Sequence, residues 1–212
     1  MPASIGNGQN PKTNLYWGAA YGIKNYFNKS KYWSLIEVRK TKGKRLERAI
    51  FKHKQKKYYL VADAYDGKFI KQTTTDFLNY SCGNNKDTLQ LKERTIGIGG
   101  NAQLSAYIGH DGLMDFELDI LFENEDKRKR EVIILACYSQ HFFSAHLKQA
   151  NVRPLLWTTG LMSPEAYTIH DALQAYINNG DNEMIQLRAA QTYSKYQKCG
   201  LAAAKRLLQS DW

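Results

Sequence analysis

Two reactive side chains each follow a short apolar segment of the chain. His110 comes two residues after the segment 104–108, and Cys137 comes two residues after the segment 132–135. Apolar runs of this length, with β-branched residues and no helical period, predict buried strands of a mostly parallel sheet. Ligands bind beyond the carboxyl ends of such strands, so we expect both side chains at one edge of the sheet. An imidazole and a thiol at that edge are a candidate base and nucleophile.

The chemistry of such a pair is acyl transfer. A thiol becomes a strong nucleophile when a neighbouring imidazole takes its proton, so His110 and Cys137 must lie within reach of each other. Acyl transfer also needs donors for the developing oxyanion. Gly109 and Gly112 leave the backbone beside His110 uncrowded. The backbone of Asp111 and Gly112 is therefore one candidate donor site, and the N–H of Cys137 is another.

The elements that must position these residues alternate between strands and helices. Strands are predicted at residues 14–21, 33–38, 48–52, 57–63, 104–108, 132–135 and 153–159. Helices are predicted at residues 22–27, 71–80, 140–150 and 163–180, followed by one or two helices over 184–208. Residues 95–100 are expected to form a glycine-rich turn without the spacing of a P-loop, and residues 115–120 a half-exposed strand or the start of a helix. This alternation predicts an α/β protein.

Composition predicts one soluble domain. The chain has 212 residues, of which 43% are apolar and 24% charged, and no linker divides it. We expect a polar leader at residues 1–13 and a single domain at 14–212. No apolar run could span a bilayer and no signal peptide is visible, which favours a cytoplasmic protein without a membrane partner. Three cysteines, an odd number, predict a free thiol rather than a disulfide framework.

Basic residues are concentrated in one segment. The chain carries 30 Lys and Arg against 20 Asp and Glu, a formal charge of +10. Much of this excess lies in residues 39–57, where Glu47 is the only acid. Such a segment could bind nucleic acid or an acidic protein partner by counterion release. Alternatively, it is a solvated hairpin whose lysines protect exposed strand edges.

The two segments with their reactive residues resemble a known family. An apolar strand that ends in a His-Gly-type motif, followed by an apolar strand that ends in Ala-Cys-x-Ser, is similar to the caspase-like (clan CD) cysteine peptidases, and the pattern is closest to gingipains, legumains and CHAT-type domains. The resemblance implies a doubly wound, mostly parallel sheet of about six strands between helices. It also implies a cysteine peptidase in which His110 is the base and Cys137 the nucleophile. Such an enzyme needs no cofactor, acts on a protein or peptide and is open to a regulatory protein partner.

Two positions depart from the family pattern. Asp111 stands between His110 and Gly112, whereas the family has glycine directly after the histidine. Leu135 occupies the position, two residues before the cysteine, where metacaspases carry an acid that binds a basic P1 side chain. The acids nearest the expected cleft are Asp63, Asp66, Asp111 and Asp115, and they make a basic P1 residue a hypothesis.

Two other functions compete with the peptidase. A metal site could combine Cys137 and His141 with His110 and the aspartates, although no HExxH or CxxC spacing supports it, and we expect no metal. In the other alternative the fold is a catalytically inactive scaffold, and its basic segment binds nucleic acid or protein. Thiol reactivity distinguishes the peptidase from the scaffold.

Overall fold

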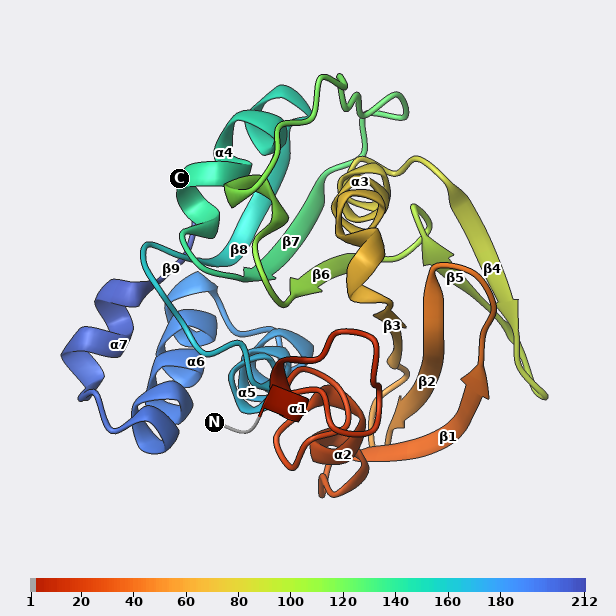
Figure 1. The fold of residues 1–212 in the computed structure, drawn as a ribbon, viewed down its shortest axis with the longest axis horizontal. Coiled ribbons are helices and arrows are strands. Elements are labelled where there is room, and N and C mark those ends of the chain that lie inside the picture. Colours follow the sequence, from red (N-terminus) through yellow and green to blue (C-terminus); the bar gives the residue numbers. More distant parts are fainter. Residues whose placement is uncertain (1–2) are drawn as a thin grey trace.

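The computed structural model describes residues 3–212, in which strands form three sheets and helices pack around them (Figure 1). The first sheet has the order β1-β2-β3, the second is the β4-β5 hairpin, and the third has the order β6-β7-β8-β9. The strands are β1 (Trp33–Lys40), β2 (Arg45–His53), β3 (Tyr59–Tyr65), β4 (Lys86–Gln90), β5 (Thr95–Gly99), β6 (Leu104–Ile108), β7 (Arg130–Leu135), β8 (Val152–Thr158) and β9 (Leu208–Gln209).

The third sheet is mostly parallel and is covered on both faces. β6, β7 and β8 run parallel, and the short β9 pairs antiparallel with β8. Alternate side chains of β7 enter two different cores: Val132 and Ile134 point to one, and Ile133 and Leu135 to the other. All four are fully buried. This is why the segment has a continuous apolar sequence rather than an alternating one.

Helices pack on the two faces of this sheet. The helices are α1 (Ala3–Gly6), α2 (Ile23–Asn28), α3 (Ile70–Ser81), α4 (Ser139–Gln149), α5 (Ala166–Ile177), α6 (Asn182–Gln197) and α7 (Leu201–Leu207). α3 and α4 contribute Phe77 and Phe143 to one core, whereas α2, α5 and α6 contribute Phe27, Tyr167 and Tyr193 to the other (Figure 1). The chain is therefore a mixed α/β protein.

The sheet has fewer strands than the sequence predicted. About six strands were expected in one mostly parallel sheet, but the structure has four, because β1, β2 and β3 form a separate antiparallel sheet. Only four residues separate β1 from β2 and five separate β2 from β3. Such short connections join antiparallel neighbours, whereas a parallel pair needs a crossover of a dozen or more residues.

Residues 14–21 were predicted to form a strand, but they form consecutive turns. The carbonyl oxygen of Asn14 accepts hydrogen bonds from the N–H groups of Trp17, Gly18 and Ala19, and its side chain accepts one from Tyr16. A Cβ at Gly18 would lie 2.1 Å from the carbonyl oxygen of Pro11. The backbone therefore folds tightly against itself here, and the apolar composition of the segment reflects burial of Trp17 rather than a strand.

Three further boundaries differ from the sequence prediction. Residues 95–99 form β5 rather than a turn, and residues 115–120 form neither a strand nor a helix. α5 begins at Ala166 rather than near Ser163, because the preceding residues are extended. The last segment, for which one helix or two were expected, forms two: α6 ends before Lys198, whose φ is +58°, and α7 follows.

The beginning of the described chain folds back on itself and contacts the segment that follows β3. The N–H of Leu15 donates to Ile5, and the N–H of Gly67, just after β3, donates to Gly8. No helix within residues 3–212 is long and apolar enough to cross a membrane.

Candidate functional site

The register of β6 and β7 places the predicted base and nucleophile at equivalent positions. Ile108 pairs with Leu135 at the carboxyl ends of the two parallel strands, and the N–H of Gly109 continues the pairing by donating to Leu135. His110 and Cys137 each follow the last paired residue by two positions. The two residues therefore leave adjacent strands at the same edge of the sheet, where parallel sheets bind ligands.

A buried polar network fixes the turn that carries Cys137. The Ser139 hydroxyl donates to the carbonyl of Ile134 at 3.0 Å and accepts from the N–H of Thr158 at 2.9 Å. The Thr158 hydroxyl donates to the carbonyl of Ala136. Ser139 and Thr158 are both fully buried, so breaking any of these bonds would leave a polar group without water. The turn between β7 and α4 is thus tied to β8.

The residue after Cys137 has an uncommon backbone conformation. Tyr138 is the N-cap of α4 and has φ +52°, in the left-handed region that a bulky side chain seldom adopts. Its N–H donates to the carbonyl of Gly160 at 3.0 Å, which holds the conformation. The consequence is a sharp turn that leaves Cys137 directly before a helix N-terminus, where backbone dipoles stabilise negative charge.

The Cys137 thiol lies among backbone groups of the loop after β8 and two tyrosines. Its Sγ accepts from the N–H of Met162 at 3.4 Å and lies 3.7 Å from the Met162 carbonyl oxygen. Burial raises the pKa of the Tyr16 hydroxyl, and the nearby Cys137 raises this pKa further. Burial likewise raises the pKa of Tyr193, and Cys137 raises this pKa further by a smaller amount. The Tyr193 hydroxyl accepts a hydrogen bond from the N–H of Ser163. Cys137 is half-buried.

The His110 imidazole is oriented by a carboxylate. Its Nε2 lies 2.6 Å from Oδ2 of Asp115. An ionised carboxylate only accepts hydrogen bonds, so Nε2 carries the proton and Nδ1 of the neutral ring is the free acceptor. No hydrogen bond joins His110 to Cys137 in the described part of the chain. The Tyr16 ring lies near the residue before His110, since it is the nearest neighbour of a Cβ placed on Gly109, at 3.8 Å.

The two residues after His110 are buried and have structural contacts. Asp111 Oδ1 accepts from the N–H of Leu113 at 3.0 Å, while its Oδ2 has no partner within residues 3–212. Loss of hydration raises the pKa of Asp111 to about 6. Gly112 is packed so closely that a Cβ there would lie 2.7 Å from the Phe116 ring. The N–H of Cys137, like that of Asp111, has no acceptor among the described residues, so both are candidates to bind an oxyanion.

The acids considered for a basic P1 residue already have internal partners. Asp63 accepts two hydrogen bonds from the Arg48 guanidinium, at 2.6 and 2.7 Å. Asp66 is buried and accepts from the N–H of Lys68 as the N-cap of a short 3₁₀ helix. Their negative charge is thus largely neutralised or used within the fold, which gives no support to the basic P1 hypothesis.

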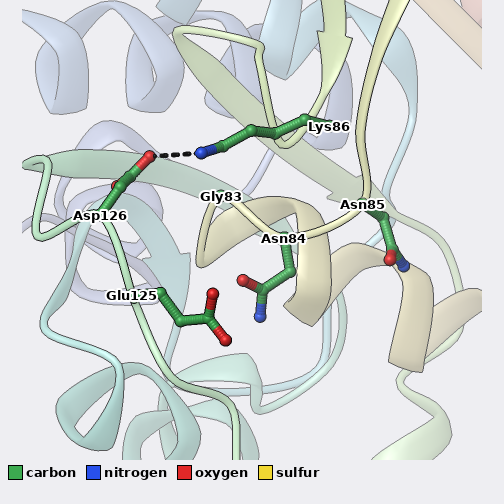
Figure 2. A pocket seen from close by; sticks show the side chains of 6 residues that line it. All are labelled: Gly83, Asn84, Asn85, Lys86, Glu125 and Asp126. Carbon is green, nitrogen blue, oxygen red and sulfur yellow. Dashed lines mark ion pairs between the residues drawn. The ribbon is translucent and has the colours of Figure 1, made fainter.

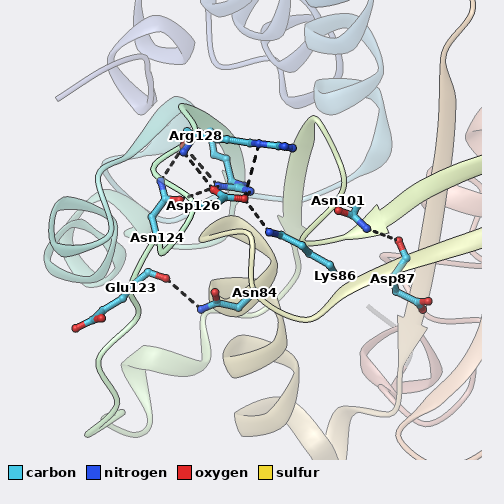
Figure 3. Close-up of polar contacts among 9 residues, drawn as sticks. Asn84, Lys86, Asp87, Asn101, Glu123, Asn124, Asp126 and Arg128 are labelled. Carbon is cyan, nitrogen blue, oxygen red and sulfur yellow. Dashed lines mark hydrogen bonds and ion pairs between the residues drawn. The ribbon is translucent and has the colours of Figure 1, made fainter.

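A separate hollow of about 550 Å³ lies between the end of α3 and the loop before β7 (Figure 2). Asp126 in its wall pairs with Arg130 at 2.6 Å and with Lys86 at 2.9 Å. Neighbouring asparagines fasten the same loop: Asn84 donates to the carbonyl of Glu123, and Asn124 to that of Arg128 (Figure 3). The hydrogen bond from Arg130 holds the pKa of Asp126 well below its ordinary value. This polar network has a structural role, because the Asp126 carboxylate is already neutralised by Arg130 and Lys86.

The remaining candidates form no hydrogen bond with His110 or Cys137 among the described residues. Cys82 is buried, and burial raises the pKa of its thiol to about 11, while Cys199 is exposed between α6 and α7. His141 lies on α4, its ring edge-on to Phe142. No group of three or more His, Cys, Asp and Glu residues within residues 3–212 could hold a metal ion.

Sequence patterns alone missed several residues of the site. Tyr16 was assigned to a strand, and Asp115 was considered only as an acid near the cleft rather than as the partner of His110. The spacing of five residues between His110 and Asp115 was the available signal, but it needs the intervening 3₁₀ turn, Gly112–Met114, to bring them together. Comparisons with family models, with curated proteins and with solved structures found no match, so the geometry described above is the basis for any functional assignment.

Proposed function

We propose that this chain is a cysteine peptidase in which Cys137 is the nucleophile, His110 the base and Asp115 the group that orients it. The observation that carries the proposal is the β6–β7 register, which sets His110 and Cys137 two residues beyond a paired strand end. The hydrogen bond from His110 to Asp115 supports it, because a base needs a third group to fix its tautomer.

The proposed reaction has two steps. First, Nδ1 of His110 takes the thiol proton, Sγ of Cys137 attacks the peptide carbonyl carbon, and the N–H of Cys137 donates to the oxyanion. The C–N bond then breaks, the imidazolium gives its proton to the leaving amine, and a thioester remains. In the second step His110 takes a proton from water, the hydroxide attacks the thioester, and the C–S bond breaks to release the carboxylate and the thiol. The imidazole must move towards Cys137 for the first step, as is common when catalytic contacts tighten only with substrate.

The caspase-like arrangement belongs to the same proposal. β6, β7 with α4, and β8 with α5 follow one another in the order that the resemblance implies, whereas β3 before α3 belongs to the separate antiparallel sheet. The parallel pairing of β6, β7 and β8 and their coverage on two faces support it.

Alkylation of individual cysteines tests the nucleophile. The protein is treated with iodoacetamide at neutral pH, and each cysteine is followed by mass spectrometry in the parent and in His110→Ala. We expect Cys137, although half-buried, to react faster than the exposed Cys199, and His110→Ala to slow only Cys137. A Cys137 that reacts only after the protein unfolds contradicts the proposal.

Peptide hydrolysis tests the activity. A mixed library of fluorogenic peptides is incubated with the parent, Cys137→Ala, His110→Ala and Cys199→Ser. We expect hydrolysis to be lost in Cys137→Ala and reduced by about 10²–10⁴-fold in His110→Ala. Cys199→Ser, the matched control, should retain the parent rate. Activity that survives in Cys137→Ala would assign the hydrolysis to another group.

The exposed basic surface favours a second candidate function, an inactive scaffold that binds an acidic partner or nucleic acid. Several exposed lysines form no ion pair with residues 3–212: Lys40, Lys42, Lys52, Lys54, Lys56 and Lys57. Binding of a labelled single-stranded oligonucleotide, measured between low and moderate salt, tests this function. A steep loss of affinity with salt in the parent, together with an inert Cys137, would favour the scaffold.

A further inference from the structure

A cavity of about 1220 Å³ separates the antiparallel sheet from the mostly parallel one. β3 forms one wall and β6 forms another, while the β4-β5 hairpin and α5 supply further residues. Its volume exceeds the roughly 300–1,000 Å³ of small-molecule pockets. The cavity therefore has room for a chain-like ligand, and His110 lies on its lining whereas Cys137 does not.

The strands on opposite walls each have a free edge. β3 pairs only with β2, and β6 only with β7, so within residues 3–212 neither has a strand on its other side. The N–H of Gly109 donates to β7, so the N–H groups of Ala106 and Ile108 point away from β7 by alternation. On β3, the bond from the His53 N–H to Tyr58 fixes the alternation, and the backbone of Val61 points away from β2. Free donors and acceptors of this kind pair readily with an added strand.

The two faces of a strand added here would meet different surroundings. On β3, Leu60 and Ala62 pack against the apolar core formed with α2 and α5. Tyr59 and Val61 point instead to the small core of the β4-β5 hairpin, and the Arg94 guanidinium lies 5.8 Å above the Tyr59 ring. A ligand strand in the cavity would therefore place alternate side chains towards the core formed with α2 and α5 and towards the hairpin core with the Arg94 guanidinium, because side chains alternate along a strand.

The charges around the cavity favour acidic side chains in the ligand. Basic residues of the lining outnumber acidic ones: Arg45, Arg48, Lys57, Lys68 and Arg94 face Asp63, Asp66 and Asp87. Asp63 is shared by two of the arginines, and Asp66 is paired with Lys68. Arg94 and Lys57 form no ion pair with any described residue.

We infer that this cavity binds an extended peptide of alternating acidic and apolar residues, which adds as a strand to the free edge of β6. Its apolar side chains pack towards α5, and its acidic side chains face Arg94. The inference goes beyond the proposed peptidase activity and does not depend on Cys137, so a binding measurement tests it separately from hydrolysis.

Binding of a defined peptide tests the inference. The probe is a fluorescein-labelled peptide of alternating Glu and Val with the length of β3, seven residues, and its anisotropy is titrated with Cys137→Ala protein so that cleavage cannot interfere. We expect saturable binding to this probe and much weaker binding when Lys replaces Glu. Equal binding of the Glu and Lys peptides, or none of the Glu peptide, overturns the inference.

Two protein variants locate the bound peptide. Ala106→Pro removes an N–H that faces the cavity but keeps the β6–β7 bonds, and we expect about fivefold to tenfold weaker binding. Ala106→Val keeps that N–H and is the control of similar size. Arg94→Glu should weaken binding by about tenfold. Lys92→Glu makes the same change of charge in the same hairpin turn outside the cavity, and should have little effect. Equal losses in both charge variants would indicate nonspecific attraction and contradict the assigned site.

Changes in the probe test the main-chain pairing without altering the protein. Two further peptides carry methyl groups on alternate backbone nitrogens, one on each set. At least one of them should lose affinity, because methylation removes the donors that pair with β6. If both retain the affinity of the parent peptide, strand addition is wrong even where the Pro variant weakens binding. Circular dichroism of Ala106→Pro shows whether a loss in that variant comes from unfolding.

Discussion

Asp111 combines complete burial with an incomplete set of hydrogen bonds. One of its oxygens caps the 3₁₀ turn after His110, and the other has no partner within the described residues. The absence of water around the carboxyl group raises its pKa to about 6, well above its value in an unfolded chain. The folded state therefore binds a proton here more tightly than the unfolded state does.

This shift predicts a pH dependence of stability. A raised folded-state pKa contributes stability that is fully present below the unfolded pKa of about 3.9 and is lost as pH rises through about 6. Two pKa units correspond to about 3 kcal/mol. Asp111→Asn keeps the capping oxygen without the charge, so we expect it to be more stable than the parent at pH 7.5 by about 1–3 kcal/mol and similar at pH 4.

Urea denaturation at both pH values measures this difference. Asp119→Asn, which removes an exposed carboxylate from the same region, is the control and should change the free energy of unfolding little at either pH. A constant difference between Asp111→Asn and the parent across the two pH values would refute the assignment.

At the scale of single residues, the sequence predicted the positions of His110 and Cys137 but not their contacts. Both follow apolar strands, and strand ends are visible in a sequence. The contact of His110 with Asp115 and the approach of Tyr16 depend on turns, whose backbone angles a residue pattern does not specify. Asp111 shows the same limit: its position beside His110 suggested a backbone donor, whereas its burial is visible only in the fold.

The connection from β7 to α4 is held by side chains rather than by backbone pairing alone. Ser139 is the first residue of α4, yet its hydroxyl bonds back to β7 and across to β8. The strained conformation of Tyr138 is maintained by this scaffold, since a left-handed non-glycine residue costs about 1–2 kcal/mol.

Removal of the Ser139 hydroxyl should loosen this connection. Ser139→Ala leaves the buried N–H of Thr158 and the carbonyl of Ile134 without that partner, and we expect a loss of about 1–3 kcal/mol in the free energy of unfolding. Ser144→Ala, in the same helix, is the matched control and should be close to neutral. Thermal unfolding of both variants provides the comparison; equal effects would mean that the network does not hold the turn.

At the scale of elements, amphipathic and apolar patterns predicted β6, β7, β8 and most helices. The pattern of each of these elements lies within its own segment and does not depend on which distant segment it contacts. The segment at residues 14–21 failed for a specific reason. Its aromatic content is typical of a strand, but Gly18 and Gly22 permit backbone contacts too close for any side chain. Glycines within an apolar segment were the signal against a strand.

At the scale of the whole molecule, a polar chain links the segment before β1 to α5 and α6. Ser30, just before β1, lies 2.8 Å from Nε2 of His170 on α5, and Nδ1 of the same ring lies 2.7 Å from Asp171. Thr192 on α6 donates to the second oxygen of Asp171. Burial raises the pKa of Asp171, but the hydrogen bonds from His170 and Thr192 more than offset it and lower that pKa below its ordinary value.

A lowered folded-state pKa has the opposite sign to the shift at Asp111. It contributes stability that is present above the unfolded pKa of about 3.9 and is lost as pH falls through the folded value. Asp171→Asn should therefore lower the urea midpoint at pH 7, and its difference from the parent should shrink towards pH 3. A difference that grows in acid would contradict the role of the ionised carboxylate.

The short connections between β1, β2 and β3 indicate antiparallel pairing, but the separation of their sheet from β6 could not be predicted from the sequence. Whether a segment forms a strand depends mainly on its own residues, whereas the choice of its partner strand depends on contacts between segments that are distant in the sequence. The apolar sequence of β3 is compatible with a place beside β6, and only the fold shows that the two edges remain apart around a cavity.

The two-residue strand β9 closes the far edge of the mostly parallel sheet. It pairs with Trp157 and Thr158 of β8, and the Arg153–Asp211 ion pair holds the segment beyond it. An uncovered edge strand is a template on which further molecules can stack into aggregates. By pairing with the end of β8, this short segment covers part of an edge that would otherwise be open to a strand of another chain.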